Sequence, residues 1–271
     1  MTLPSVDASP DVSFDARVFQ RAGASERDAW VGGVAKRLNR RFFAVIRGVI
    51  DPDAPETLAA QREARDFMTA PTHAYPWSVD GARILLRALA PSSGLGASYT
   101  HLFAASEPAR ALFAAVAAAC LTTAERERLA AGHVGGVAHP VIQTSESWKV
   151  HHGLHNDSRR SGITMPLVAS FILEQGAHAS HLLLWPSGQP AAKSVETRVG
   201  DLCLMRDCIE AKPGQVLYPL THGTRAATEP AGAERVVAIL RFGIVPECTV
   251  SAVSAAGLDL MDVYLKALTR G

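Results

Sequence analysis

The sequence lacks the features that would assign it to several broad classes of protein. Its four cysteines (Cys120, Cys203, Cys208 and Cys248) form no C-x-x-C pair, which argues against a structural zinc site or a disulfide framework. Free thiols in a reducing cytoplasm fit this usage better, so we expect a cytoplasmic protein. Lys and Arg number 27 against 26 for Asp and Glu, a net charge of +1. This balance gives no electrostatic case for nucleic acid or an anionic membrane as the main partner.

Long apolar runs and several common catalytic motifs are also missing. The most apolar run, residues 109–121, is too short to span a bilayer and is expected to form a buried helix. The N-terminus lacks the basic and apolar regions of a secretory signal. The sequence contains no G-x-S-x-G elbow, no P-loop and no G-x-G-x-x-G following a strand, which excludes the commonest hydrolases, NTPases and dinucleotide-binding proteins.

The pattern of elements predicts one domain, over residues 1–271, with a helical first half and a β-rich second half. Residues 1–15 are expected to be a flexible tail. Helices are predicted over 25–41, 54–69, 107–131 and 258–268. Ser25 is the expected N-cap of the first, and the third is expected to break where Thr123 caps its second segment. The first predicted strand covers 42–50. From about residue 139, short β-like runs separated by Gly, Pro or Ser are typical of a sandwich or barrel. We therefore expect a mainly β fold with flanking helices (α+β), whose core lies at about 139–245.

The most informative motif is His155-Asn156-Asp157. Two histidines and one carboxylate are the ligands of a non-haem Fe(II) site that leaves coordination positions open for a co-substrate and oxygen. In an extended strand, side chains at i and i+2 point to the same face, so His155 and Asp157 can bind one metal ion. The third ligand must come from another strand beside the first, and His222, with predicted strands on both sides, is the candidate.

Two other interpretations of these histidines compete with a metal site. The triplet can arise by chance in a chain with ten histidines, and a lone histidine is more often a core or surface residue than a ligand. However, no other histidine here has a carboxylate two residues later. His152 and His155 could instead chelate a metal if their segment were helical, but Gly153 and the absence of a helical pattern disfavour that arrangement.

Over about residues 139–245 the sequence resembles the Fe(II)/2-oxoglutarate-dependent dioxygenases. The resemblance rests on the order of its parts: the H-x-D motif, a β-hairpin over 163–184, the Gly200-Asp201 turn entering a strand, His222, and then Arg235 on the next strand. It implies a double-stranded β-helix, or jelly-roll, core with an N-terminal helical support. One departure is the segment 206–218, which lengthens the usual path from the Gly-Asp strand to the distal histidine.

The resemblance also implies the roles of the site residues. His155, Asp157 and His222 would bind Fe(II), and Arg235 would anchor the distal carboxylate of 2-oxoglutarate, with O2 as the other co-substrate. A guanidinium suits that task because its planar fork pairs with both oxygens of a carboxylate. Arg235 could instead be a strand-edge residue paired with a nearby glutamate. Arg225 and Arg241 are the other candidate anchors, although Arg241 lies about 20 Å further along the strand.

The function implied is a non-haem Fe(II)- and 2-oxoglutarate-dependent oxygenase that oxidises, most simply hydroxylates, a small molecule in secondary metabolism or amino-acid modification. Residues expected near the barrel mouth are candidates for substrate contact; they are Trp148, Arg159, Arg160, Trp185, Arg206 and Arg225. A halogenase is disfavoured, because Asp157 fills the coordination position that a halide needs. The alternative from another class is a cupin-like protein that binds a metal or small ligand without turnover. The sequence leaves the substrate and the oligomeric state open.

Overall fold

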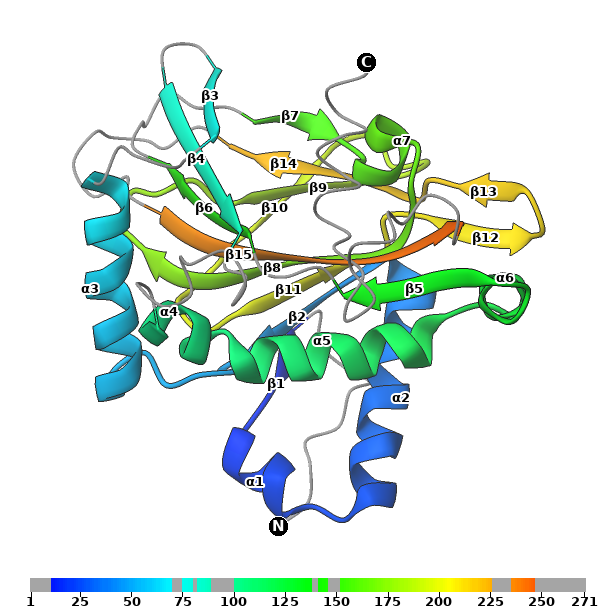
Figure 1. Cartoon of the computed structure of the whole chain (residues 1–271), viewed down its shortest axis with the longest axis horizontal. Helices are drawn as coiled ribbons and strands as arrows, with labels where there is room; N and C mark the ends of the chain where they lie inside the picture. Colours follow the sequence, from blue (N-terminus) through cyan, green and yellow to red (C-terminus); the bar gives the residue numbers. More distant parts are fainter. Residues whose placement is uncertain are drawn as a thin grey trace.

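The computed structural model describes residues 11–69, 75–79, 82–88, 100–137, 141–145, 152–225 and 235–246. Within them, two antiparallel β-sheets enclose an apolar interior, and helices cover the outer face of the larger sheet (Figure 1). The helix expected over 258–268 lies outside the described residues.

The larger sheet contains most of the strands. Its order is β1 (Asp11–Ser13), β2 (Phe43–Arg47), β11 (Leu202–Met205), β8 (Thr164–Gln175), β15 (Arg235–Pro246), β6 (Val141–Ser145), β4 (Ala82–Ala88) and β3 (Tyr75–Val79), with β5 (His133–Val137) also paired to β15. The pairs are antiparallel except for β1 and β2, which are parallel. The long strands β8 and β15 form the centre of this sheet.

The smaller sheet carries two of the three predicted metal ligands. Its order is β10 (Lys193–Val195), β9 (Leu182–Pro186), β14 (Leu220–Thr224) and β7 (His152–His155). Apolar side chains from both sheets meet between them; they include Val45, Val168, Leu182, Leu184, Cys203, Met205 and Leu220. Two sheets packed face to face in this way form the jelly-roll core that the sequence predicted.

Helices form a second apolar core against the outer face of the larger sheet. Buried side chains of this core come from α2 (Ala24–Arg41), α3 (Pro55–Thr69), α4 (Thr100–Ala105) and α5 (Glu107–Cys120), and Phe19 of α1 (Ala16–Arg21) packs against them. The other two helices, α6 (Thr123–Ala130) after α5 and the short α7 (Asp157–Ser161) after β7, have no residue in this core. In Figure 1, α5 runs below β8 and β15. Its buried positions recur at helical spacing and join the core with the outward side chains of those strands; they are Ala109, Leu112, Phe113, Val116, Ala117 and Cys120.

The apolar stretch Thr100–Cys120 has the length and composition of a membrane span. Its second part, α5, buries one face in the core beside α2 and the larger sheet. This packing is that of a core helix, as expected from the sequence.

Several local expectations were wrong. β8 and β9 form no hairpin, because β8 pairs with β11 and β15 whereas β9 pairs with β10 and β14. Part of the expected tail is ordered, since β1 pairs with β2. Gly23, not Ser25, is the N-cap of α2, and Thr122 rather than Thr123 caps α6. The extra segment before His222 folds into a separate hairpin, β12 (Ile209–Lys212) with β13 (Gln215–Leu217).

The Gly200-Asp201 turn lies where the resemblance places it, directly before β11. Gly200 has φ +86°, and a Cβ there would lie 2.5 Å from the carbonyl oxygen of Ile50. Asp201 accepts the backbone N–H of Arg198 at 2.7 Å and forms an ion pair with Arg47. Glycine is therefore required at this turn both by its backbone conformation and by the approach of a neighbouring loop.

Candidate metal centre

His155, Asp157 and His222 lie together at one end of the smaller sheet. Their ligand atoms are all within 4.8 Å of one another. His155 and His222 are paired positions of the neighbouring strands β7 and β14, with ring centroids 4.6 Å apart. Oδ1 of Asp157 lies 3.6 Å from Nε2 of His155. The structure thus brings together the three residues that the sequence singled out, in a geometry that can hold one metal ion on three protein ligands.

Asp157 reaches this position from a helix, not from a strand as we expected. β7 ends at His155, Asn156 is the extended N-cap residue, and Asp157 is the first residue of α7. The side chain of Asn156 accepts the N–H of Arg159 at 2.8 Å and donates to the carbonyl oxygen of Leu220 on β14 at 3.0 Å. Asn156 therefore fixes the start of α7 to the strand that carries His222, a role that its position inside the motif did not reveal.

A second buried carboxylate, Asp207, supports the site and was missed from the sequence. It accepts the backbone N–H groups of Asp157 at 3.0 Å and Ser158 at 2.6 Å. Its Oδ1 also lies 3.8 Å from Nδ1 of His222. Burial first, and then the negative charge of Asp157, raise the pKa of Asp207 above its ordinary value. The distance to His222 exceeds that of a hydrogen bond, but a carboxylate on the Nδ1 side of the ring is the arrangement that commonly orients a metal-binding histidine.

Both imidazoles turn Nδ1 toward an oxygen acceptor. Nδ1 of His155 lies 2.9 Å from the carbonyl oxygen of Gly153, and Nδ1 of His222 faces Asp207. An imidazole whose Nδ1–H is directed at an acceptor presents its Nε2 lone pair for coordination. The backbone carbonyl beside His155 and the carboxylate beside His222 therefore favour the tautomer that a metal site needs.

Arg241 on β15 contacts the carboxylate of Asp157, the candidate ligand. Its Nε donates to Oδ2 of Asp157 at 2.9 Å, and both side chains are buried. Burial alone would raise the pKa of Asp157, but the charges of Arg241, His222 and His155 outweigh burial and hold that pKa below its usual range. Asp157 is thus ionised, as a metal ligand must be.

Arg235 lies on the same face of β15 as Arg241. The intervening Val236, Ala238 and Leu240 pack into the helical core, so alternation directs Arg235 toward the interior between the sheets. Its side chain is only 5% exposed, and its Nε has no hydrogen-bond partner within the described part of the chain. Burial lowers the pKa of Arg235 to about 10, so the guanidinium remains charged at neutral pH. The interior therefore holds a cation for which no carboxylate of the described residues supplies a counter-charge.

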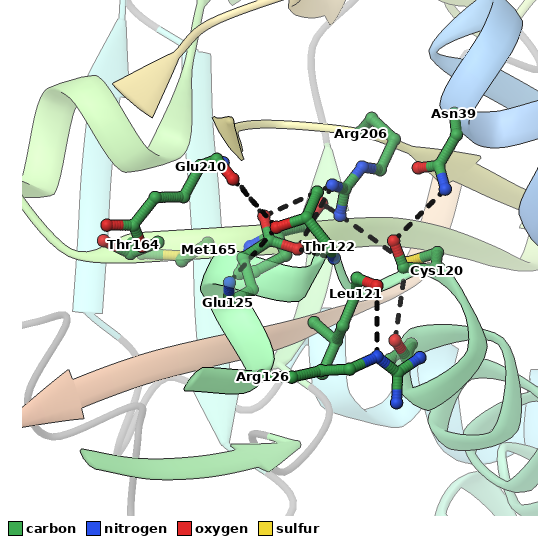
Figure 2. A network of polar contacts seen from close by, with 12 residues as sticks. Asn39, Cys120, Leu121, Thr122, Glu125, Arg126, Thr164, Met165, Arg206 and Glu210 are labelled. Carbon is green, nitrogen blue, oxygen red and sulfur yellow. Dashed lines mark hydrogen bonds and ion pairs between the residues drawn. The ribbon is translucent and has the colours of Figure 1, made fainter. Parts of the chain in front are cut away.

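Arg206 does not lie at the barrel mouth, contrary to our expectation. It is fully buried, and Nη2 lies 3.3 Å from both carboxylate oxygens of Glu125. Figure 2 shows Arg206 and Glu125 within a polar network that includes Thr122, Cys120 and Glu210. This network joins α6 to the segment that follows β11. Arg206 therefore supports the fold and cannot contact a substrate from this position.

The other expected substrate residues differ in their positions. Arg159 and Arg160 are exposed on α7, directly after Asp157, and Arg225 is exposed at the end of β14. Trp185 is 42% exposed and donates Nε1–H to the carbonyl oxygen of Gln189. Trp148 lies outside the described residues. Arg159 and Arg225 therefore remain candidates for substrate contact at the rim of the site.

Comparison with known proteins identifies the fold. No protein-family model and no curated protein matches the sequence. Among solved structures, a prolyl hydroxylase from Trichoplax adhaerens, in complex with a hypoxia inducible factor peptide, has a TM-score of 0.56 at 12% identity, covering 85% of this chain and 94% of that one. The non-haem alpha-ketoglutarate-dependent epimerase SnoN of nogalamycin biosynthesis has a TM-score of 0.54 at 15% identity, covering 79% and 82%.

A third similar structure is the dioxygenase for auxin oxidation from rice, with a TM-score of 0.54 at 12% identity, covering 89% of this chain and 84% of that one. SnoN has also been solved with Fe3+, alpha-ketoglutarate and nogalamycin RO. At these identities the likeness establishes the fold, which is that of the Fe(II)/2-oxoglutarate-dependent oxygenases, as the resemblance predicted.

Proposed function

We propose that the protein is a non-haem Fe(II)- and 2-oxoglutarate-dependent oxygenase that hydroxylates a small-molecule substrate in the cytoplasm. The proposal combines three features of the described residues: two imidazoles and a carboxylate that meet at one point, a buried guanidinium in the same interior, and a fold shared with oxygenases of this kind. The fold alone would not support an activity, so the argument depends on the site.

The donor set fits Fe(II). His155 and His222 would each supply Nε2 and Asp157 would supply Oδ1, a 2-His-1-carboxylate set that leaves coordination positions open. When bound, the metal would supply the activation of O2. Asp157 occupies the position that a halide would need, which favours oxygen transfer over halogenation.

The burial of the charged Arg235 is the observation that most strongly supports the proposal. Arg235 has no anionic partner among the residues that the structure describes, and a buried cation without one is costly, so its charge indicates that an anion binds beside it. The distal carboxylate of 2-oxoglutarate would match the planar fork of the guanidinium. Arg235 and Arg241 are six residues apart on one strand, about 20 Å at the rise of an extended chain. Val237 and Ile239 lie between the two arginines on the same face of the strand.

The overall reaction balances as 2-oxoglutarate, O2 and a C–H substrate giving succinate, CO2 and the hydroxylated product. The proteins with similar structures include a prolyl hydroxylase and an epimerase. Hydroxylation is the simplest outcome for a carboxylate-containing ligand set, and the exposed Arg159 and Arg225 are the proposed substrate contacts at the rim.

Oxidation of the co-substrate in the absence of a substrate tests this proposal. Purified protein with Fe(II) and ascorbate should convert 2-oxoglutarate slowly to succinate, and His222→Ala should abolish the conversion. A cupin-like protein without turnover would bind the metal but form no succinate above the level of His222→Ala, and this result would contradict the proposal.

A further inference from the structure

Arg241 binds one oxygen of the Asp157 carboxylate and leaves the other oxygen directed at the candidate metal position. Nε of Arg241 holds Oδ2 of Asp157 at 2.9 Å, whereas Oδ1 is the oxygen that faces Nε2 of His155, 3.6 Å away. Arg241 comes from the larger sheet and Asp157 from α7, so the contact joins two elements far apart in the sequence. Asp157 is 1% exposed and Arg241 is 6% exposed, which places the pair largely beyond the screening of water.

We propose that Arg241 is a positioning residue of the metal centre: it limits Asp157 to one metal-binding oxygen, balances the charge of this carboxylate before metal arrives, and weakens the site's affinity for divalent cations. The inference rests on the proposed function, because it assumes that the three residues bind a metal.

The limit to one oxygen follows from the hydrogen bond. A carboxylate that binds through both oxygens would occupy two of six coordination positions, and only two would stay open beside the histidines. With Oδ2 held by Arg241, Asp157 occupies one position and three stay open. Three open positions are the number needed for a co-substrate that chelates through two atoms and for oxygen.

The effect on affinity follows from charge. A metal ion on Oδ1 would lie close to the guanidinium that holds Oδ2, and two cations at this separation in a buried site repel each other strongly. Without metal, the same guanidinium is the counter-charge that makes a buried carboxylate tolerable. Loss of the charge at Arg241 should therefore destabilise the metal-free protein and strengthen metal binding, since the metal then supplies the missing positive charge.

A purely structural ion pair would behave differently. If Arg241 only stabilised the fold, its removal would lower the stability of the metal-free and metal-loaded protein equally, and affinity would not change. If it only oriented Asp157, its removal would weaken metal binding, as is usual for residues that orient ligands. The direction of the change in affinity therefore separates these roles.

The experiment measures Co(II) binding by visible absorption, and thermal unfolding with and without Co(II), for the wild type, Arg241→Gln, Arg241→Lys and Arg235→Gln. Gln keeps a donor but removes the charge, whereas Lys keeps the charge. Arg235→Gln is the matched control, because Arg235 is a buried arginine on the same face of the same strand. Among the described residues it forms no ion pair with Asp157 or any other carboxylate.

For Arg241→Gln we expect a melting temperature at least about 5 °C lower without metal. Saturating Co(II) should restore most of this loss, and Co(II) should bind at least about tenfold more tightly than to the wild type. Arg241→Lys and Arg235→Gln should bind Co(II) within a few-fold of the wild type. Should Arg241→Gln unfold without metal, purification with Co(II) and chelator-induced unfolding give the same comparison.

Weaker or unchanged Co(II) binding by Arg241→Gln would overturn the inference and leave the proposed function intact. Equal tightening in Arg241→Lys would also overturn it, because charge would then not be the cause. Absence of Co(II) binding by the wild type would overturn both the inference and the proposed function.

Discussion

The carboxylate of Asp207 accepts the backbone N–H of Asp157, fifty positions earlier in the chain, at 3.0 Å. Through its Oδ1 the same carboxylate lies 3.8 Å from Nδ1 of His222. One buried side chain thus contacts two of the three candidate ligands, which come from α7 and β14. Asp207 follows Arg206, and the ion pair of Arg206 with Glu125 fixes this segment to α6. The position of the candidate metal site therefore depends on contacts outside the His155-Asn156-Asp157 motif.

Replacing Asp207 with Ala should weaken metal binding about 10- to 100-fold, because both the start of α7 and the ring of His222 lose an orienting partner. Titration with Co(II) measures the change. Asp51→Ala is the control, since exposed Asp51 also accepts a backbone N–H, from Asp53, but lies outside the site. Equal affinities for Asp207→Ala and the wild type would show that Asp207 only stabilises the fold.

Glu125→Gln should lower the free energy of unfolding by about 3–5 kcal/mol, because it removes one charge of a buried pair and leaves Arg206 uncompensated. Urea denaturation measures this loss, which is a large part of the stability of an ordinary domain. Exposed Glu127 on the same helix provides the comparison, and Glu127→Gln should change stability by less than about 0.5 kcal/mol. Similar losses in the two variants would contradict the structural role of the pair.

Two glycines with similar backbone angles allow the Gly-Asp turn to be tested. Gly200 has φ +86° and Gly188 has φ +80°, but only a Cβ at Gly200 would meet another atom, the carbonyl oxygen of Ile50 at 2.5 Å. Both substitutions to Ala carry the strain of a positive φ, about 1–3 kcal/mol. Gly200→Ala should cost clearly more, measured by thermal unfolding, because the loop must also move. Equal losses of stability in the two variants would mean that the loop at Ile50 moves away from the added Cβ without a loss of stability.

The sequence allowed the three candidate ligands to be predicted, but not the side chains that hold them. His155 and Asp157 could be chosen from their spacing and His222 from its place between strands. The contacts of Asp207 and Arg241 with Asp157 join positions 50 and 84 residues apart. No local sequence pattern indicates partners so far apart in the chain. For this reason Arg241 was considered only as an alternative anchor for 2-oxoglutarate. Arg206 was misplaced because its partner, Glu125, is 81 residues away on a helix.

The same limit applies to the fold. Alternating and β-branched segments predicted the strands β8 and β9, but strand pairing depends on long-range contacts, so the expected hairpin was wrong. The start of α7 was missed because the chain changes from strand to helix within one residue. Asn156 is still extended and caps the helix through its side chain, whereas Asp157 is already helical.

The most direct test of the account is anaerobic binding of 2-oxoglutarate to the Fe(II)-loaded protein, compared between the wild type and Arg235→Gln by calorimetry. We expect the wild type to bind 2-oxoglutarate, and Arg235→Gln to bind it about 30- to 5,000-fold more weakly while its Fe(II) affinity stays near that of the wild type. Equal affinity of the two proteins for 2-oxoglutarate would show that Arg235 is not the anchor, and no binding by the wild type would contradict the proposed activity itself.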